Sequence, residues 1–176
     1  MGDPRKIRKK FSTPSHPWRA ERIEEEHKLA KDFGLKNMRE IWKGKTFLST
    51  ASYQAKRLIS LHTPQAEIEK KQLLSRLISL GMLPVTATLT DVLSLTVKDV
   101  LSRRLQTLVV QKKFARTMKQ ARQFITHEHF MVNNKVVSSP SYLTSKMEED
   151  LITFNPTSNL SSTEHPERAI KEGGSK

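Results

Sequence analysis

Apolar residues recur at helical spacing through much of the first hundred positions. A first amphipathic segment spans 19–33 and is followed by Gly34, a residue typical of helix ends. A second segment spans roughly 38–61, with Gly44 inside it as a point where the helix could break. The N-terminal part of the chain is therefore expected to be helical.

Capping residues mark three later helix starts. Thr63 precedes Pro64, which suits the first helical position, and this helix is expected to end near Gly81. Thr117 opens a shorter helix, about 117–127. Between them, the stretch Thr96-Val97-Lys98-Asp99 has the spacing of a capping box. One helix from that start would place on one side Val97, Val100, Leu101, Leu105 and Leu108.

After residue 127 the pattern changes to short apolar runs rich in β-branched residues. Three such runs, 130–132, 136–137 and 151–154, predict strands. Asn133 and Asn134 separate the first two, and asparagine tolerates the left-handed conformation that tight hairpins need. The fold class is therefore α+β, with two helices packed on a short, mostly antiparallel sheet after a helical N-terminal domain.

The composition divides the chain into four segments. Residues 1–18 carry many cations and three prolines without helical spacing, and predict an extended basic arm. Residues 19–95 form the helical domain and 96–155 the α+β domain. Residues 156–176 are polar and are expected to be a tail that is mobile or ordered by a partner.

The excess of positive charge indicates a polyanionic partner. The 176 residues include 31 Lys and Arg against 18 Asp and Glu, a net charge of +13 with a pI near 10.1. The sequence contains no run of about 18 apolar residues, which is the length needed to span a bilayer. The absence of cysteine excludes disulfides, thiolate metal sites and cysteine nucleophiles. We therefore expect a soluble protein whose polyanionic partner is a nucleic acid and not a membrane.

The cations are concentrated in the window 103–135, which has a net charge of +7 because Glu128 is its single acid. Ordinary solvated faces mix both signs, whereas a face of one sign is typical of phosphate binding. At about 100° per residue, the helix 117–127 packs through Met118, Ala121 and Ile125. Its other side presents Arg116, Lys119, Gln120, Gln123 and His127.

Two motifs suggest other chemistry and fail on spacing. Gly44-Lys45-Thr46 ends like a phosphate-binding loop, but the earlier glycine of that loop is Arg39 here and no strand precedes it. His127-Glu128-His129 lacks the second histidine of a zinc-protease helix, since that position is Met131. We expect no metal, no cofactor and no catalytic residue, because no nucleophile or second clustered carboxylate completes a site.

The segment ARTMKQARQFITHEHFMVNNKVVSSPSYL is similar to the core of the RNA-binding domain named after small-subunit ribosomal protein "S-four". The N-terminal stretches PRKIRKKFSTPSHPW and RIEEEHKLAKDFGLKNMREIW resemble the archaeal and eukaryotic branch of that family. Together the matches cover nearly all of residues 3–155. The motifs that carry the resemblance are Arg103-Arg104-Leu105-Gln106, Ala121-Arg122-Gln123, His127-Glu128-His129, Val132-Asn133-Asn134-Lys135 and Pro140-Ser141-Tyr142.

The resemblance implies a cytoplasmic ribosomal protein that binds small-subunit ribosomal RNA early in assembly. It also implies neighbouring small-subunit proteins as partners, and messenger RNA at the channel through which it enters the subunit. Two positions depart from the family, which has glycine where Glu128 and Asn134 stand. The same domain occurs in RNA-modifying enzymes and RNA chaperones, and these remain the alternatives.

The candidate RNA-binding residues combine the basic window, the family motifs and the arm. No catalytic residue is among them. They are Arg5, Lys6, Arg8, Lys9, Lys10, Arg103, Arg104, Lys112, Lys113, Arg116, Lys119, Arg122, Gln123, His127, His129, Asn134, Lys135, Ser141 and Tyr142.

Overall fold

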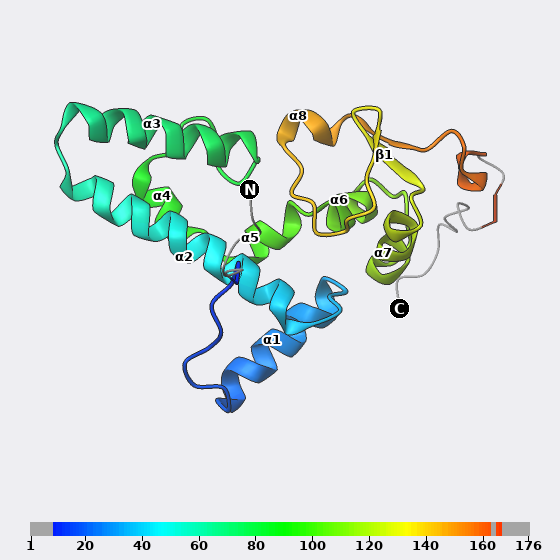
Figure 1. Cartoon of the computed structure of the whole chain (residues 1–176), viewed down its shortest axis with the longest axis horizontal. Coiled ribbons are helices and arrows are strands. Elements are labelled where there is room, and N and C mark those ends of the chain that lie inside the picture. The colour runs from blue at the N-terminus through cyan, green and yellow to red at the C-terminus, as the bar shows by residue number, and fades with distance from the viewer. Residues whose placement is uncertain (1–8, 163–164, 167–176) are drawn as a thin grey trace, which may run out of the picture.

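The chain folds into a helical N-terminal part and a smaller part that carries a three-stranded sheet (Figure 1). The computed structural model describes residues 9–162 and 165–166. The expected α+β class is confirmed. The helices are α1 (Ala20–Asp32), α2 (Met38–Ser60), α3 (Pro64–Ser79), α4 (Leu89–Ser94), α5 (Val97–Ser102), α6 (Leu105–Gln111), α7 (Met118–Thr126) and α8 (Lys146–Glu149). The strands are β1 (Phe130–Val132), β2 (Lys135–Val136) and β3 (Ile152–Phe154), and a 3-10 turn, η1, spans Asn159–Ser161.

The sheet is antiparallel, with the order β2-β1-β3. Asn133 and Asn134 join β1 to β2 with φ angles of 49° and 60°. Two successive positive φ angles define the tight turn whose twist matches that of antiparallel strands. The predicted hairpin is confirmed, although β2 begins one residue earlier than expected, at Lys135, where it pairs with Val132.

The α1–α2 pair is held together by a buried carboxylate. Glu26 accepts from Arg22 Nη1 at 2.7 Å, Lys45 Nζ at 2.6 Å and Trp42 Nε1 at 3.2 Å. Burial raises the pKa of Glu26, but these donors outweigh burial and leave that pKa below its usual value. Helix α2 continues through Gly44, where a Cβ would lie 3.6 Å from Val97 Cγ1, so α5 packs closely against α2 there.

The single helix expected from Thr96 onward is wrong, because Arg103 and Arg104 divide it into α5 and α6. Arg104 is extended, with φ −76° and ψ 143°, and bridges to Leu143. The Arg103 carbonyl accepts from Thr144 N at 3.1 Å. This pairing with a distant segment competes with continued helix and ends α5, which periodicity alone does not reveal.

Two helices were missing from the sequence prediction, although both carry a start signal. Thr88 and Asp91 form a capping box at α4, and Ser145 and Glu148 form one at α8. Both helices are short, so they have too few turns for apolar spacing to be recognised. The Thr63 cap of α3 is confirmed, since its hydroxyl accepts from Ala66 N at 3.2 Å.

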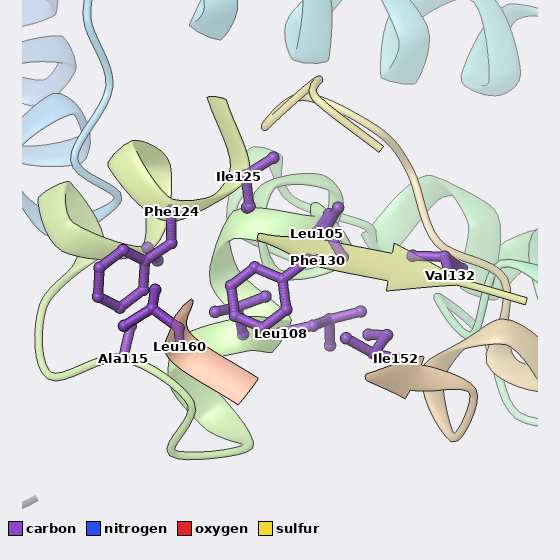
Figure 2. Close-up of a cluster of buried hydrophobic side chains, with 11 residues drawn as sticks. Leu105, Leu108, Ala115, Phe124, Ile125, Phe130, Val132, Ile152 and Leu160 are labelled. Carbon is purple, nitrogen blue, oxygen red and sulfur yellow. The ribbon is translucent and has the colours of Figure 1, made fainter. Parts of the chain in front are cut away.

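The buried side chains form two clusters, one in each part of the chain. The first is built mainly from α2 and α3, with Leu58, Leu77 and Val92 among its members. The second lies between α6, α7 and the sheet, where the ring of Phe130 lies among helix side chains (Figure 2). Leu160 of η1 belongs to this second cluster and is 5% exposed, so η1 contacts the core through this residue. The domain boundary at 95/96 stays a prediction.

Candidate nucleic-acid interface

Helix α7 is amphipathic, and its polar side is the centre of the candidate interface. Thr117 caps it by accepting from Gln120 N at 3.2 Å. Ala121, Phe124 and Ile125 are buried in the core. The exposed residues on the polar side, which we call the α7 face, are Lys119 and Gln123 of the helix, Arg116 just before it and His127 at its C-terminal cap.

The α7 face offers a cationic stripe with amide and imidazole groups beside it. Lys119 has no hydrogen bond or ion pair to any residue that the structure describes. Arg116 is exposed but is also oriented, because its Nη2 donates to Pro166 O at 2.9 Å. Such groups can contact phosphates and ribose hydroxyls without first breaking a buried network.

Two arginines that the sequence predicts as RNA contacts pair with a partly buried carboxylate within the fold. Arg104 and Arg122 both pair with Glu40 of α2, with Arg122 Nη2 2.8 Å from Glu40 Oε1. The Arg104 side chain is 5% exposed. Burial raises the pKa of Glu40, but hydrogen bonds from Arg122 and Arg104 outweigh it and lower that pKa. The pairs join the N-terminal part of the chain to α6 and α7.

Two further cations of the basic window are held by α8. Arg103 Nη2 lies 2.8 Å from Glu149 Oε2, and its side chain is 13% exposed. Lys112 Nζ donates to the Glu149 carbonyl and lies 3.4 Å from Asp150 Oδ1. With Arg104 and Arg122, these residues are four predicted RNA contacts that already pair with carboxylates within the fold, four cations with the three acids Glu40, Glu149 and Asp150. Lys113, by contrast, is exposed.

The His127-Glu128-His129 triplet forms the turn from α7 into β1. The two imidazole rings stack with centroids 6.2 Å apart, and His129 Nδ1 lies 2.7 Å from Ser158 Oγ. Burial, and then the nearby His127 and His165, lower the pKa of His129 and so favour its neutral form at neutral pH. His129 is half-buried in this turn, whereas His127 is exposed.

Glu128 lies at the centre of this turn and has a φ angle of 64°. This left-handed conformation costs a side chain about 1–2 kcal/mol and suits glycine. We expect Glu128→Gly to raise the free energy of unfolding by about 0.5–1 kcal/mol, since the glycine's flexible unfolded state offsets part of the gain. Binding of RNA should tighten a few-fold, because an exposed carboxylate is lost.

Glu128→Gln is the matched control for that prediction. It removes the charge and keeps the side chain at positive φ, so it should tighten RNA binding without raising the midpoint of urea unfolding. A Glu128→Gly variant that is no more stable than Glu128→Gln would contradict the strain argument.

The remaining candidates are spread over three other places. Asn134 and Lys135 are exposed in the hairpin. Ser141 is exposed, whereas the Tyr142 hydroxyl donates to Glu148 Oε1 at 2.7 Å, and this hydrogen bond chiefly raises the pKa of Tyr142. Lys9 and Lys10 are exposed in the arm. Arg5, Lys6 and Arg8 lie outside the described residues.

The geometry gives no support to nucleotide-loop or metal chemistry. Gly44-Lys45-Thr46 lies inside α2, and Lys45 pairs with Glu26, so this segment cannot curl around phosphates. Within residues 9–162 and 165–166, no cluster of three His, Asp or Glu side chains is arranged to hold a metal ion. No helix in those same ranges is long and apolar enough to cross a membrane.

Sequence reasoning missed two sets of residues that the fold makes important. Glu40 organises the arginines, and no local motif marks it. The cations of α2 and α3 were also missed, among them Arg39, Lys43 and Arg76, which line a groove of about 800 Å³. The sequence did contain a signal for the cations of α2, because this helix carries five cations and Glu40 is its only acid.

Comparison with known proteins shows that the chain is similar to members of one family. The S4 domain family model matches residues 103–150. The small ribosomal subunit protein uS4 of Methanococcus aeolicus is 50% identical over 169 residues, covering 96% of this chain and 96% of that protein. The protein of the same name from Ignicoccus hospitalis is 49% identical over 158 residues, covering 90% and 95% respectively. That of Picrophilus torridus is 47% identical over 176 residues, covering 98% and 96%.

Proposed function

Because the chain belongs to the family of the small ribosomal subunit protein uS4, it is a structural constituent of that subunit, and we propose that the α7 face binds the ribosomal RNA. As in its relatives, its role on the cytoplasmic ribosome is structural and not enzymatic. It would hold a local RNA fold by neutralising phosphates while its own helices stay rigid.

The observation that carries this proposal is the single sign of the α7 face. Lys119 stands on a helix whose opposite side is buried, so the core fixes the direction of this cation, and Arg116 lies two residues before that helix, where its hydrogen bond to Pro166 O orients it. Gln123 and His127 continue the same stripe and can hydrogen-bond ribose hydroxyls or base edges. A cationic, rigid helix face of this kind suits the wide, shallow groove of an RNA duplex.

The other exposed candidates extend the proposed contact. Lys113, Lys135, Asn134 and Ser141, with Lys9 and Lys10 of the arm, would add contacts to the RNA backbone around α7. We further propose that binding occurs early in assembly, beside other small-subunit proteins. A position near the channel that messenger RNA enters, with an effect on translational accuracy, belongs to the same proposal.

Co-sedimentation tests the proposed function directly. The chain should pellet with small ribosomal subunits and remain with them after a wash at high salt, because many phosphate contacts act together. A role as a free RNA chaperone or as a subunit of an RNA-modifying enzyme predicts release into the supernatant. Complete recovery there would overturn the proposal.

Single substitutions then test the α7 face. The affinity for ribosomal RNA falls as the salt concentration rises, and Arg116→Ala and Lys119→Ala should each make this fall less steep. The slope of log K against log salt should become less negative by roughly one unit in each variant. At about 0.1 M salt this corresponds to roughly an eight-fold loss of affinity. Filter binding at several salt concentrations provides the measurement, and Lys28→Ala on α1 is the control for an exposed lysine elsewhere.

Arg122→Ala separates the two kinds of arginine in this region. Its guanidinium is paired with Glu40, so its loss should lower stability while changing the salt slope less than Arg116→Ala does. Equal slopes for the wild type, Arg116→Ala and Lys119→Ala would exclude the α7 face as the contact.

A further inference from the structure

A groove on the N-terminal part of the chain combines an apolar floor with a cationic rim. Its volume is about 800 Å³, within the range of sites that hold small organic groups. Helices α2, α3 and α5 and the segment 140–143 form its walls. The floor is apolar and includes Phe47, Leu73, Leu77 and Leu101.

The cations on the rim form no ion pair with a residue that the structure describes. Lys10, Arg39, Lys43 and Arg76 are exposed, and none of them forms an ion pair with a residue in the described ranges. Glu40 is the one carboxylate among the described lining residues, and it is already paired with Arg104 and Arg122. The lining thus carries six cations against one acid, so the groove favours an anionic occupant.

An aromatic ring and a guanidinium lie together at one wall of the groove. The guanidinium of Arg76 sits over the ring of Phe47, with its Cζ 5.8 Å from the ring centroid. Nucleobases stack on such guanidinium planes and aromatic rings. Asn37, Thr50 and Gln54 also line the groove and can hydrogen-bond a base edge or a ribose hydroxyl.

We propose that this groove binds one unstacked nucleotide of ribosomal RNA, with its base against Phe47 and Arg76 and its flanking phosphates on Lys10, Arg39 and Lys43. The proposal rests on the proposed function, which supplies the RNA. Continuity favours RNA over an acidic peptide, because Ser141 lines the groove and belongs to the candidate RNA contacts of the α+β part. An acidic peptide would also leave the ring and guanidinium at the wall of the groove without a stacking partner.

A short RNA with a fluorescent base tests this assignment on the full chain. The probe is a single-stranded nonanucleotide with 2-aminopurine at its centre, whose fluorescence changes when the base leaves its neighbours and stacks on protein. Arg76→Ala and Phe47→Leu should each weaken binding by about 5- to 100-fold, the range for removing one base-stacking partner. Both variants should also reduce the fluorescence change at saturation.

Arg57→Ala is the matched control, since Arg57 is an exposed arginine of α2 that does not line the groove. It should retain the full fluorescence change, and thermal melting will show whether Phe47→Leu remains folded. An unchanged fluorescence response in Arg76→Ala would overturn the proposal. So would displacement of the RNA by polyglutamate at equal charge concentration, because the groove would then be an acidic-peptide site.

The outcomes for the two proposals can be told apart. If the wild type pellets with small subunits but the nonanucleotide shows no base-stacking signal, the groove assignment fails and the proposed function stands. If the wild type does not pellet with subunits, the proposed function itself fails, whatever the oligonucleotide does.

Discussion

Replacing Glu40 by alanine is expected to lower the free energy of unfolding by about 3 kcal/mol. The substitution leaves Arg104, which is 5% exposed, as a buried charge without a partner, and breaking a buried ion pair in this way is strongly destabilising. Arg122, less deeply buried, can turn toward water and so adds less to the loss. Urea unfolding followed by circular dichroism measures the change.

Glu21→Ala is the matched control for Glu40→Ala. Glu21 forms an ion pair with Arg19 that is as long as the Arg122–Glu40 pair, 2.8 Å, but both of its side chains are largely exposed. Exposed pairs contribute about 0–1 kcal/mol, so this variant should be nearly as stable as the wild type. Equal losses for the two variants would contradict the assignment of Glu40 as the link between the two parts of the chain.

The same carboxylate makes stability depend on pH. The pKa of Glu40 is lowered from its ordinary value of 4.5, so the folded state binds this proton less readily than the unfolded state. The stabilisation is therefore present above about pH 4.5 and is lost as the pH falls through the folded pKa. The wild type should lose more stability over that interval than Glu40→Ala does.

Gly34→Ala is expected to destabilise the fold by about 2–5 kcal/mol. Gly34 has a φ angle of +57°, which costs alanine about 1–2 kcal/mol. The new Cβ would also lie 2.7 Å from Met118 Cβ, at the start of α7, and such overpacking typically costs about 1–3 kcal/mol. Differential scanning calorimetry of the purified variant measures the loss.

Gly81→Ala isolates the backbone contribution to that result. Gly81 has a φ angle of +69°, but the Cβ would meet only the guanidinium end of Arg103, at 3.0 Å from Cζ, a looser contact than the 2.7 Å at Gly34. It should therefore lose only about 1–2 kcal/mol. If Gly34→Ala were no worse than Gly81→Ala, the close approach of the α1–α2 loop to α7 would be refuted.

Local signals were sufficient for most of the elements. The Thr63 cap, the Asn133-Asn134 turn and the apolar side of α7 follow from short-range stereochemistry and spacing, and the structure confirms all three. The α+β class and the family also followed from patterns in the sequence. The break between α5 and α6 did not, because it depends on pairing between Arg104 and Leu143, 39 residues apart.

The sequence by itself determined that this protein is basic, that its cations gather around one amphipathic helix, and that it belongs to a ribosomal family. Only the tertiary structure decided which of these cations pair with carboxylates within the fold. Arg104 and Arg122 are paired with Glu40, 64 and 82 residues away. A charge count gives the sign of each residue but not its distance in space from a carboxylate far away in the sequence. Coulomb attraction depends on that spatial distance and on burial. For the same reason, the groove beside α2 could emerge only once the helices were packed.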